Sequence, residues 1–181
     1  MRLIPVTKHT LSYMQSLYKE AFPKKERKPF SLLLKKQKQG IADLFLIEGE
    51  KNSPLGLLIT MQDPSSDIVL LDYLAITPNG RGKGTGSQAL SLFRRKYEGK
   101  RLLLEIEKPD PSAANSEERL RRKNFYLRNH FTETGICVQV YGVEMELLTN
   151  GCPLTFEDYV LLYKNTMGKL HTAFLRIKKI S

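Results

Sequence analysis

The sequence predicts an α/β (α+β) fold in which antiparallel-looking strands alternate with helices, followed by a short C-terminal extension. Three observations predict it. Apolar residues switch repeatedly between the two-residue period of strands and the 3.6-residue period of helices. Turn residues separate successive strand-like segments in the first half of the chain, as they do in hairpins. A glycine-rich segment then joins an apolar strand to a helix.

The N-terminal part is expected to hold a strand, two helices and three further strands. Thr7 is placed to cap the first helix, and Phe22-Pro23 ends it because proline interrupts a helix. Gly40 ends the second helix. Turns between the three strands make antiparallel hairpins of them. The expected ranges are strand 2–6, helix 7–21, a short helix through 32–34, and strands 43–48, 55–62 and 68–76.

The C-terminal part is expected to alternate helices and strands. The helix after the glycine-rich segment stops at Gly99. A later helix is expected to place Leu120, Leu127 and Phe131 on one face. The expected ranges are helix 85–98, strand 101–107, helix 117–130, strands 136–140 and 143–148, helix 156–163 and a short last strand. We expect one domain over residues 1–150 and an extension over 151–181 that packs on it.

The composition narrows the class of partner. Lys and Arg number 29 against 19 Asp and Glu, a net charge of +10, which favours a polyanion such as nucleic acid or a phosphorylated small molecule. The chain has no Trp, and few aromatic residues lie among its basic clusters, so the sequence argues against a base-stacking nucleic-acid surface. No apolar run approaches the roughly 20 residues of a membrane helix, and no secretion signal is evident. We expect a cytoplasmic protein with no membrane partner, monomeric or homodimeric. The scattered histidines and two cysteines predict no metal site.

The segment from Leu71 to Ser87 carries the strongest functional signal. It brings backbone N–H groups, a helix N-terminus and two cations to one place, which suits a bound diphosphate. A Walker P-loop is excluded because Lys83 is followed by Gly84. A dinucleotide-binding fingerprint matches residues 84–89 better, and Glu105 lies near the required distance from it. That motif, however, needs its first glycine directly after the strand, and here seven residues separate the two.

A third interpretation fits best. Arg81-x-x-Gly84-x-Gly86 after a strand resembles the acetyl-CoA signature of the GCN5-related N-acetyltransferase (GNAT) family. The order of elements over roughly residues 1–150 resembles the same fold, which implies three layers with a central, mixed but mostly antiparallel sheet flanked by helices. The helix over 121–131, which contains Phe125-Tyr126, resembles the family's second signature, although His130 stands where many members have glycine.

The resemblance implies acetyl-CoA as cosubstrate and no metal. The backbone of the strand before the loop would pair with the pantetheine arm, and the Leu74 N–H would stabilise the oxyanion. Asn115 resembles a residue that touches the pantetheine arm. The cofactor-binding residues implied are Leu74, Ala75, Ile76, Arg81, Gly82, Lys83, Gly84, Thr85, Gly86, Ser87, Asn115 and Tyr126.

The implied reaction is direct attack of a primary amine, of a small molecule or a protein, on the thioester. Tyr126 matches the family's general acid. Glu105 and Asp72 are the two candidates for the base, since both are carboxylates inside apolar strands. Glu105 and Glu107 share a face of their strand, where they are placed to fix a substrate amine or to pair with lysines; Glu107 is assigned to substrate binding. Glu26 and Arg27 lie where the family has its substrate-side loop. A CoA-binding regulatory module without turnover, or a nucleic-acid-binding module on the same fold, remains the alternative.

Overall fold

The computed structural model describes residues 1–140, 142–168 and 177–180. Helices and strands follow one another along the chain in the predicted order. They form two compact units, which we describe separately: unit 1 comprises Met1–Pro64 and Leu71–Glu98, and unit 2 comprises Ser65–Leu70 and Gly99–Ser181. The domain boundary expected at residue 150 stays a prediction. Residues 169–176 and 181 of the expected extension lie outside the described residues.

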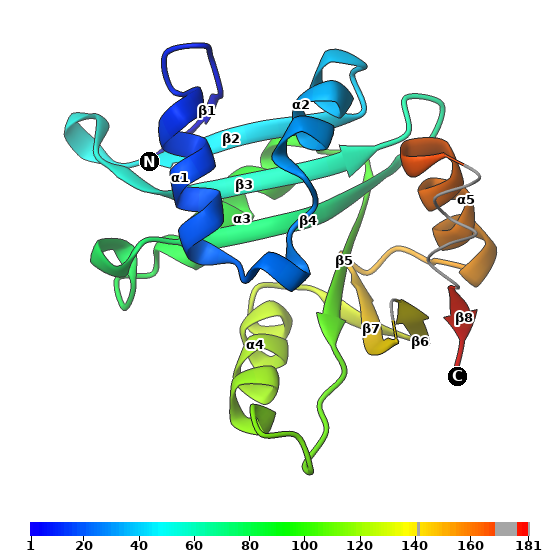
Figure 1. Ribbon diagram of the computed structural model, residues 1–181. Coiled ribbons are helices and arrows are strands. Elements are labelled where there is room, and N and C mark those ends of the chain that lie inside the picture. The colour runs from blue at the N-terminus through cyan, green and yellow to red at the C-terminus, as the bar shows by residue number, and fades with distance from the viewer. Residues whose placement is uncertain (141, 169–176, 181) are drawn as a thin grey trace. The chain divides into compact units, whose positions relative to one another are not determined.

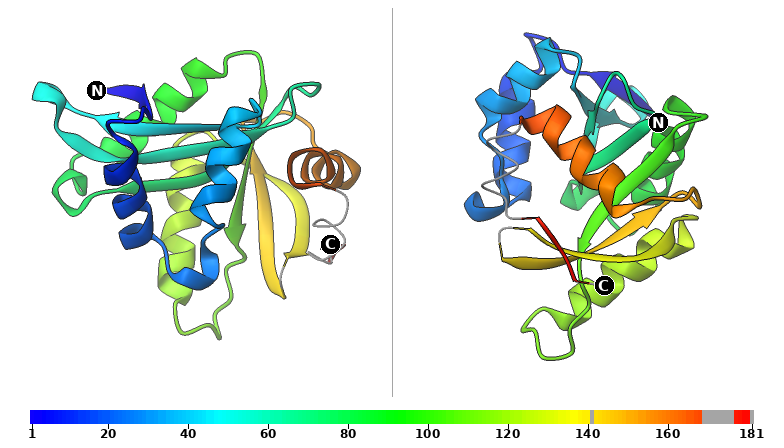
Figure 2. Two further views of the ribbon diagram at one scale, coloured as in Figure 1. Left: turned by 45° about the horizontal axis from the view of Figure 1, so that its top comes forward. Right: turned by 90° about the vertical axis from the view of Figure 1, so that its right-hand side faces the viewer.

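Unit 1 is a sheet covered by helices on both faces (Figure 1). Its strands lie in the order β1-β2-β3-β4, and the β1–β2 and β2–β3 pairs are antiparallel. Helices α1 and α2 lie on one face and α3 on the other (Figures 1 and 2). Each helix buries its apolar stripe against the sheet, as Leu17, Leu33 and Phe93 show. The bounds are β1 Arg2–Pro5, α1 Leu11–Ala21, η1 Lys24–Glu26, α2 Phe30–Lys38, β2 Ala42–Glu48, η2 Glu50–Asn52, β3 Pro54–Gln62, β4 Ile68–Ile76 (whose first three residues belong to unit 2), η3 Pro78–Gly80 and α3 Thr85–Lys96.

Helix α1 begins later than the sequence predicts, because Thr7 does not cap it. The Thr7 N–H donates to the Thr10 hydroxyl at 3.0 Å, so residues 7–10 form a turn of their own. Thr10 then occupies the N-cap position before Leu11. A turn over residues 7–10 competes here with a helix that starts at Thr7, since threonine side chains bond nearby backbone groups in turns as readily as at helix caps.

Gly56 in β3 allows the backbone of β4 to come close. A Cβ atom at this position would lie 2.2 Å from the Ala75 carbonyl oxygen, a backbone atom that cannot turn aside. We therefore expect Gly56→Ala to lower the free energy of unfolding by about 3 kcal/mol, at the upper end of overpacking effects. Gly99→Ala is the control, because its Cβ would meet nothing within 4 Å and only its positive φ of 78° is strained. Equal losses in urea unfolding would contradict this account.

Unit 2 holds a second group of antiparallel strands. They lie in the order β5-β7-β6-β8. The Leu102–Leu104 run of β5 is fully buried, as expected for a strand in the middle of a core. Helix α4 lies beside β5 (Figure 2). The bounds are β5 Arg101–Glu107, α4 Ser116–Arg128, β6 Thr132–Val140, β7 Val143–Thr149, α5 Phe156–Met167 and β8 Lys178–Lys179.

The prediction that Leu120 lies with Leu127 and Phe131 on a buried face is wrong for Leu120, which is 52% exposed. Positions 119 and 123 of α4 face inward instead, and both are basic. Arg119 pairs with Glu107 of β5 at 3.3 Å, and Lys123 pairs with Glu146 of β7 at 2.8 Å. Leu120 lies about 100° around the helix from Arg119 and so faces away. The pattern of apolar residues therefore predicted the wrong inner face for α4, because ion pairs hold that face.

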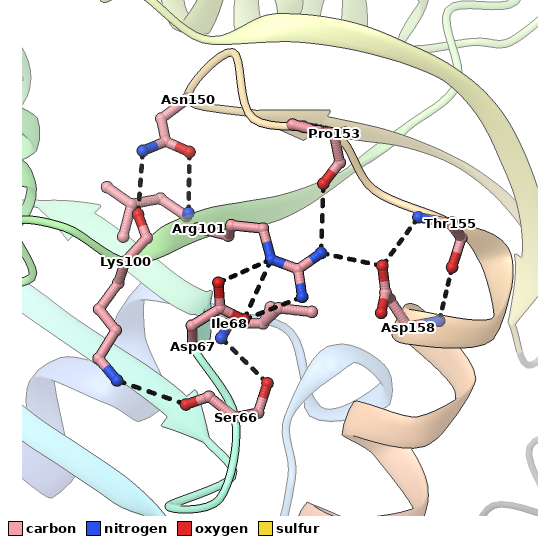
Figure 3. Close-up of polar contacts among 10 residues, drawn as sticks. Ser66, Asp67, Ile68, Lys100, Arg101, Asn150, Pro153, Thr155 and Asp158 are labelled. Carbon is pink, nitrogen blue, oxygen red and sulfur yellow. Dashed lines mark hydrogen bonds and ion pairs between the residues drawn. The ribbon is translucent and has the colours of Figure 1, made fainter.

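Arg101 fixes the start of α5 to β5 (Figure 3). Its guanidinium donates to both carboxylate oxygens of Asp67 at 2.9–3.1 Å, to Asp158 at 2.9 Å and to the Pro153 carbonyl at 3.3 Å. Asp158 also closes a capping box with Thr155 at the N-terminus of α5. The segment after residue 150 is thereby tied to the rest of unit 2.

These contacts predict a pH dependence of stability. Hydrogen bonds from Arg101 lower the pKa of Asp67 from its ordinary 3.8. Burial alone would raise the pKa of Asp158, but hydrogen bonds from Arg101 and Thr155 lower it overall. A carboxylate whose pKa is lower in the folded state contributes stability above its unfolded pKa and loses that contribution as the pH falls through its folded pKa.

We therefore expect Arg101→Gln to be less stable than the unmodified protein at neutral pH by about 1 kcal/mol, a modest value because Asp67 is half exposed. The difference should shrink in acid, once both aspartates are protonated. Urea unfolding at neutral pH and at about pH 3 measures it. A difference that is constant between the two pH values would contradict the assignment.

Candidate active site

The glycine-rich segment of unit 1 connects the end of β4 to the start of α3. Its beginning is anchored on β3, because the N–H and the hydroxyl of Thr77 both donate to the Leu55 carbonyl, at 2.8 and 3.1 Å. Gly80 is buried against the Ile76 side chain. The chain then emerges, and residues 81–84 are exposed. Gly84 has φ 72°, a left-handed conformation that favours glycine.

The N-terminus of α3 presents backbone N–H groups that have no partner within the helix. Gly84 is the N-cap residue and has no side chain with which to cap the helix. The first backbone hydrogen bond of the helix runs from Gln88 N–H to the Gly84 carbonyl at 3.0 Å. The N–H groups of Thr85, Gly86 and Ser87 therefore have no partner within the helix.

The charge along the sequence on either side of these donors is of one sign. No Asp or Glu occurs from residue 73 to residue 97, whereas Arg81 and Lys83 flank the donors. Arg81 Nε donates to the Ile76 carbonyl at 3.2 Å, which holds its guanidinium at the end of β4. Helix dipole, N–H groups and cations together favour an anionic ligand such as a diphosphate.

Asp72 lies on β4, two residues before Leu74, and is engaged in an ion pair. Lys28 Nζ lies 2.5 Å from Asp72 Oδ1, and the two side chains are 21% and 6% exposed. The pattern of residues placed Asp72 in an apolar strand but gave no sign of Lys28, which stands 44 positions away in a basic run. Lys28 is thus a site residue that the sequence analysis missed.

Glu26 and Arg27, expected on the acceptor side, lie in the segment that precedes α2. The Tyr73 hydroxyl holds this segment against β4, since it donates to the Glu26 carbonyl at 3.0 Å and accepts from the Lys28 N–H at 3.0 Å. The Glu26 side chain itself is exposed. Unit 1 therefore brings together the loop, Asp72 and the 26–28 segment around one strand.

In unit 2 the structure brings Glu107 and Asn115 together. Asn115 Nδ2 donates to Glu107 Oε2 at 3.3 Å, and Asn115 Oδ1 accepts from Arg119 Nε at 2.9 Å. Arg119 also pairs with Glu107 at 3.3 Å. Glu107 is thus paired with a basic side chain, which was one of the two expectations, although its partner is an arginine and not a lysine.

Glu105, two residues earlier on β5, is bound by the C-terminal helix. The Tyr163 hydroxyl of α5 donates to Glu105 Oε1 at 2.7 Å. Tyr163 is buried. Because 58 positions separate the two residues, no local pattern in the sequence indicates this contact.

Tyr126 lies half-buried on α4 among aromatic rings. Its ring packs edge-on against Phe125 and Phe131, with centroids 5.2 and 6.0 Å away. Burial raises the pKa of its hydroxyl to about 12, and the nearby charge of Arg122 opposes the rise. Within the described residues, no hydrogen bond engages this hydroxyl, so it is available to a ligand.

Comparison with solved structures identifies the fold. The chain matches a protein from Bacteroides thetaiotaomicron described as an acetyltransferase of the GNAT family, with a TM-score of 0.74 and 22% identity over 93% of this chain and 99% of that one. The chain has the GNAT fold. It also matches spermidine N-acetyltransferase from Vibrio cholerae, solved in complex with CoA and spermine, with a TM-score of 0.60 and 14% identity over 81% and 92% of the two chains.

The GNAT fold confirms the predicted fold class and the resemblance from which it was drawn. Among curated proteins, the chain is similar to the acetyltransferase YjbC of Bacillus subtilis, at 36% identity over 63 residues. That match spans 35% of this chain and 30% of the relative. No protein-family model matches the chain.

Within residues 1–140, 142–168 and 177–180, no group of three or more His, Cys, Asp or Glu side chains could hold a metal ion. None of the helices in these ranges is both long and apolar enough to cross a bilayer.

Proposed function

We propose that this protein is an acetyl-CoA-dependent N-acetyltransferase that transfers the acetyl group to a primary amine. The observation that carries the proposal is the segment from Arg81 to Ser87, where a helix N-terminus capped by no side chain of the described residues follows two cations at the end of a strand. The GNAT fold supports it, as does the CoA bound by the Vibrio cholerae neighbour. That neighbour's spermine supports an amine as the acceptor class.

In this proposal the diphosphate of CoA lies on the N–H groups of Thr85, Gly86 and Ser87. Arg81 and Lys83 supply charge, and Gly82 and Gly84 leave room for the close approach of the phosphates. The pantetheine arm pairs with the backbone of Leu74, Ala75 and Ile76, and Asn115 contributes a contact to it. The Leu74 N–H stabilises the oxyanion that forms when the amine attacks the thioester.

Three side chains are assigned to the reacting amine and the leaving sulfur. The acceptor ammonium must lose a proton before it attacks, and Glu105 and Asp72 are the two candidates to take it. Tyr126 donates a hydrogen bond to the departing sulfur. A hydroxyl of pKa about 12 stays protonated at neutral pH, which suits a donor and not a base. Because an alkyl thiol has a pKa of about 8.5, Tyr126 stabilises the developing thiolate mainly by hydrogen bonding. Glu26, Arg27 and Glu107 are assigned to acceptor binding.

The experiment that separates this proposal from a nucleic-acid-binding module compares ligands. We expect acetyl-CoA at a hundred times its Kd to stabilise the protein by about 2.7 kcal/mol, seen as a rise in melting temperature. Duplex DNA should bind only weakly and in a strongly salt-dependent manner, through the net charge of +10. Tight DNA binding with no response to acetyl-CoA would overturn the proposal. A CoA-binding regulator would respond to acetyl-CoA but release no thiol in the presence of amines.

A further inference from the structure

A buried carboxylate in unit 1 holds a primary amine of the protein itself. Asp72 and Lys28 form an ion pair with 2.5 Å between Oδ1 and Nζ. The ammonium also lies over the Tyr73 ring, 5.3 Å from its centroid. A carboxylate beside an aromatic face is a usual recognition site for a primary ammonium group, through a charged hydrogen bond and a cation–π contact.

The main chain of Lys28 is fixed while its side chain reaches the surface. Tyr73 accepts a hydrogen bond from the Lys28 N–H at 3.0 Å, and the Tyr18 hydroxyl donates to the Lys28 carbonyl at 3.2 Å. Tyr18 and Tyr73 pack edge to face, with centroids 4.9 Å apart. The Lys28 side chain is 21% exposed, so solvent and ligands can reach it.

The second oxygen of the carboxylate is not engaged by the part of the chain that the structure describes. Asp72 Oδ2 is buried and has no hydrogen-bond partner among the described residues. Buried carboxylate oxygens without partners are uncommon in folded proteins and indicate a functional role or a missing ligand. Asp72 also lies one strand repeat from Leu74, about 7 Å along β4, where the proposed function places the thioester.

We propose that Lys28 is an acetyl acceptor, so that the protein acetylates its own Lys28 with Asp72 as the base. The inference rests on the proposed function, because acetyl-CoA is the donor. The amine is already bonded to a carboxylate, which is the geometry that a general base requires. Its attachment to the same unit as the donor-binding loop replaces a bimolecular encounter by an intramolecular one.

The step forms one bond, breaks one bond and moves two protons. Asp72 takes one proton from the Lys28 ammonium, and the freed lone pair of Nζ attacks the acetyl carbonyl carbon. A C–N bond forms, the C–S bond breaks, and the electron pair leaves on the CoA sulfur. The nitrogen's second proton neutralises the thiolate, and the proton on Asp72 passes to solvent. The products are N-acetyl-lysine, free CoA thiol and one proton.

The test is peptide mass spectrometry of the full chain after incubation with acetyl-CoA. We expect one acetyl group on Lys28, gained about 10²-fold faster than on Lys24 and Lys25, exposed lysines of the same segment that lack a carboxylate base. Its first-order rate constant should not change with protein concentration. Asp72→Asn should slow the gain at Lys28 about 10²-fold. The rise in melting temperature with acetyl-CoA shows in the same sample that the variant is folded and binds the donor.

The outcomes separate this inference from the proposed function. One outcome is that acetyl-CoA stabilises the protein and added amines are acetylated, but Lys28 stays unmodified. That outcome would overturn the inference and leave the proposed function standing. Uniform acetylation of Lys24, Lys25 and Lys28 that is unaffected by Asp72→Asn would also overturn it. The absence of any response to acetyl-CoA would remove the proposed function itself.

Discussion

Gly84→Asp is expected to abolish acetyl-CoA binding. The new carboxylate would stand at the N-cap of α3, next to the N–H groups of Thr85, Gly86 and Ser87. It would accept their hydrogen bonds itself, since aspartate is a preferred N-cap residue, and it would repel the diphosphate. Like-charge contacts of this kind cost several kcal/mol, so we expect Kd to rise by a factor of about 10³. Isothermal titration calorimetry with acetyl-CoA measures it.

Two variants isolate the effect of the charge. Gly84→Ala carries the same strain from φ 72° without a carboxylate, and nothing lies within 4 Å of its Cβ. It should fold and bind acetyl-CoA with at most a moderate loss. Gly99→Asp places the same carboxylate at another open, positive-φ glycine beyond the far end of α3 and should bind normally. A rise in Kd for Gly84→Asp no larger than that for Gly84→Ala would contradict the diphosphate placement.

Tyr126→Phe is expected to lower kcat about 10²-fold, the lower range of general acid catalysis, while the KM for acetyl-CoA changes little. The reason is that only the hydroxyl is removed, and it interacts with the sulfur only as negative charge develops there. Initial rates of thiol release at varied acetyl-CoA, with an amine that the protein accepts, give both constants.

The structure also makes this variant easy to interpret. Since the Tyr126 hydroxyl bonds to none of the described residues, Tyr126→Phe should keep the packing on Phe125 and Phe131 and unfold at an unchanged temperature. Phe125→Leu is the control for altered packing on the same helix and should act on stability more than on kcat. An unchanged kcat in Tyr126→Phe would contradict the assignment of Tyr126 as the hydrogen-bond donor to the departing sulfur.

Most of the fold follows from local sequence signals. Strands β4 and β5 begin and end where periodicity predicts, because each is a continuous apolar run bounded by turn or charged residues. The prediction for α4 failed because charged side chains, and not apolar ones, form its inner face. Leu120 was expected inside because it is apolar, yet the inner face of α4 is held by Arg119 and Lys123 through ion pairs with β5 and β7.

In the candidate site, likewise, one part could be predicted from local sequence and another could not. The loop from Arg81 to Ser87 is contiguous, so its spacing, glycines and charge could all be recognised in the sequence. The partners of the carboxylates could not. Lys28 contacts Asp72, and Tyr163 contacts Glu105, from positions that are distant along the chain. The local sequence around a basic or aromatic residue does not indicate which distant residue it contacts.

The most direct test of acetyl transfer is the release of CoA thiol from acetyl-CoA in the presence of a panel of amines, including spermine, followed by mass analysis of the products. We expect at least one amine to raise thiol release well above the rate without amine, with an equal amount of N-acetylated product. We expect Gly84→Asp to remove that release. Binding of acetyl-CoA without amine-dependent release across the panel would contradict the account and leave a CoA-binding module.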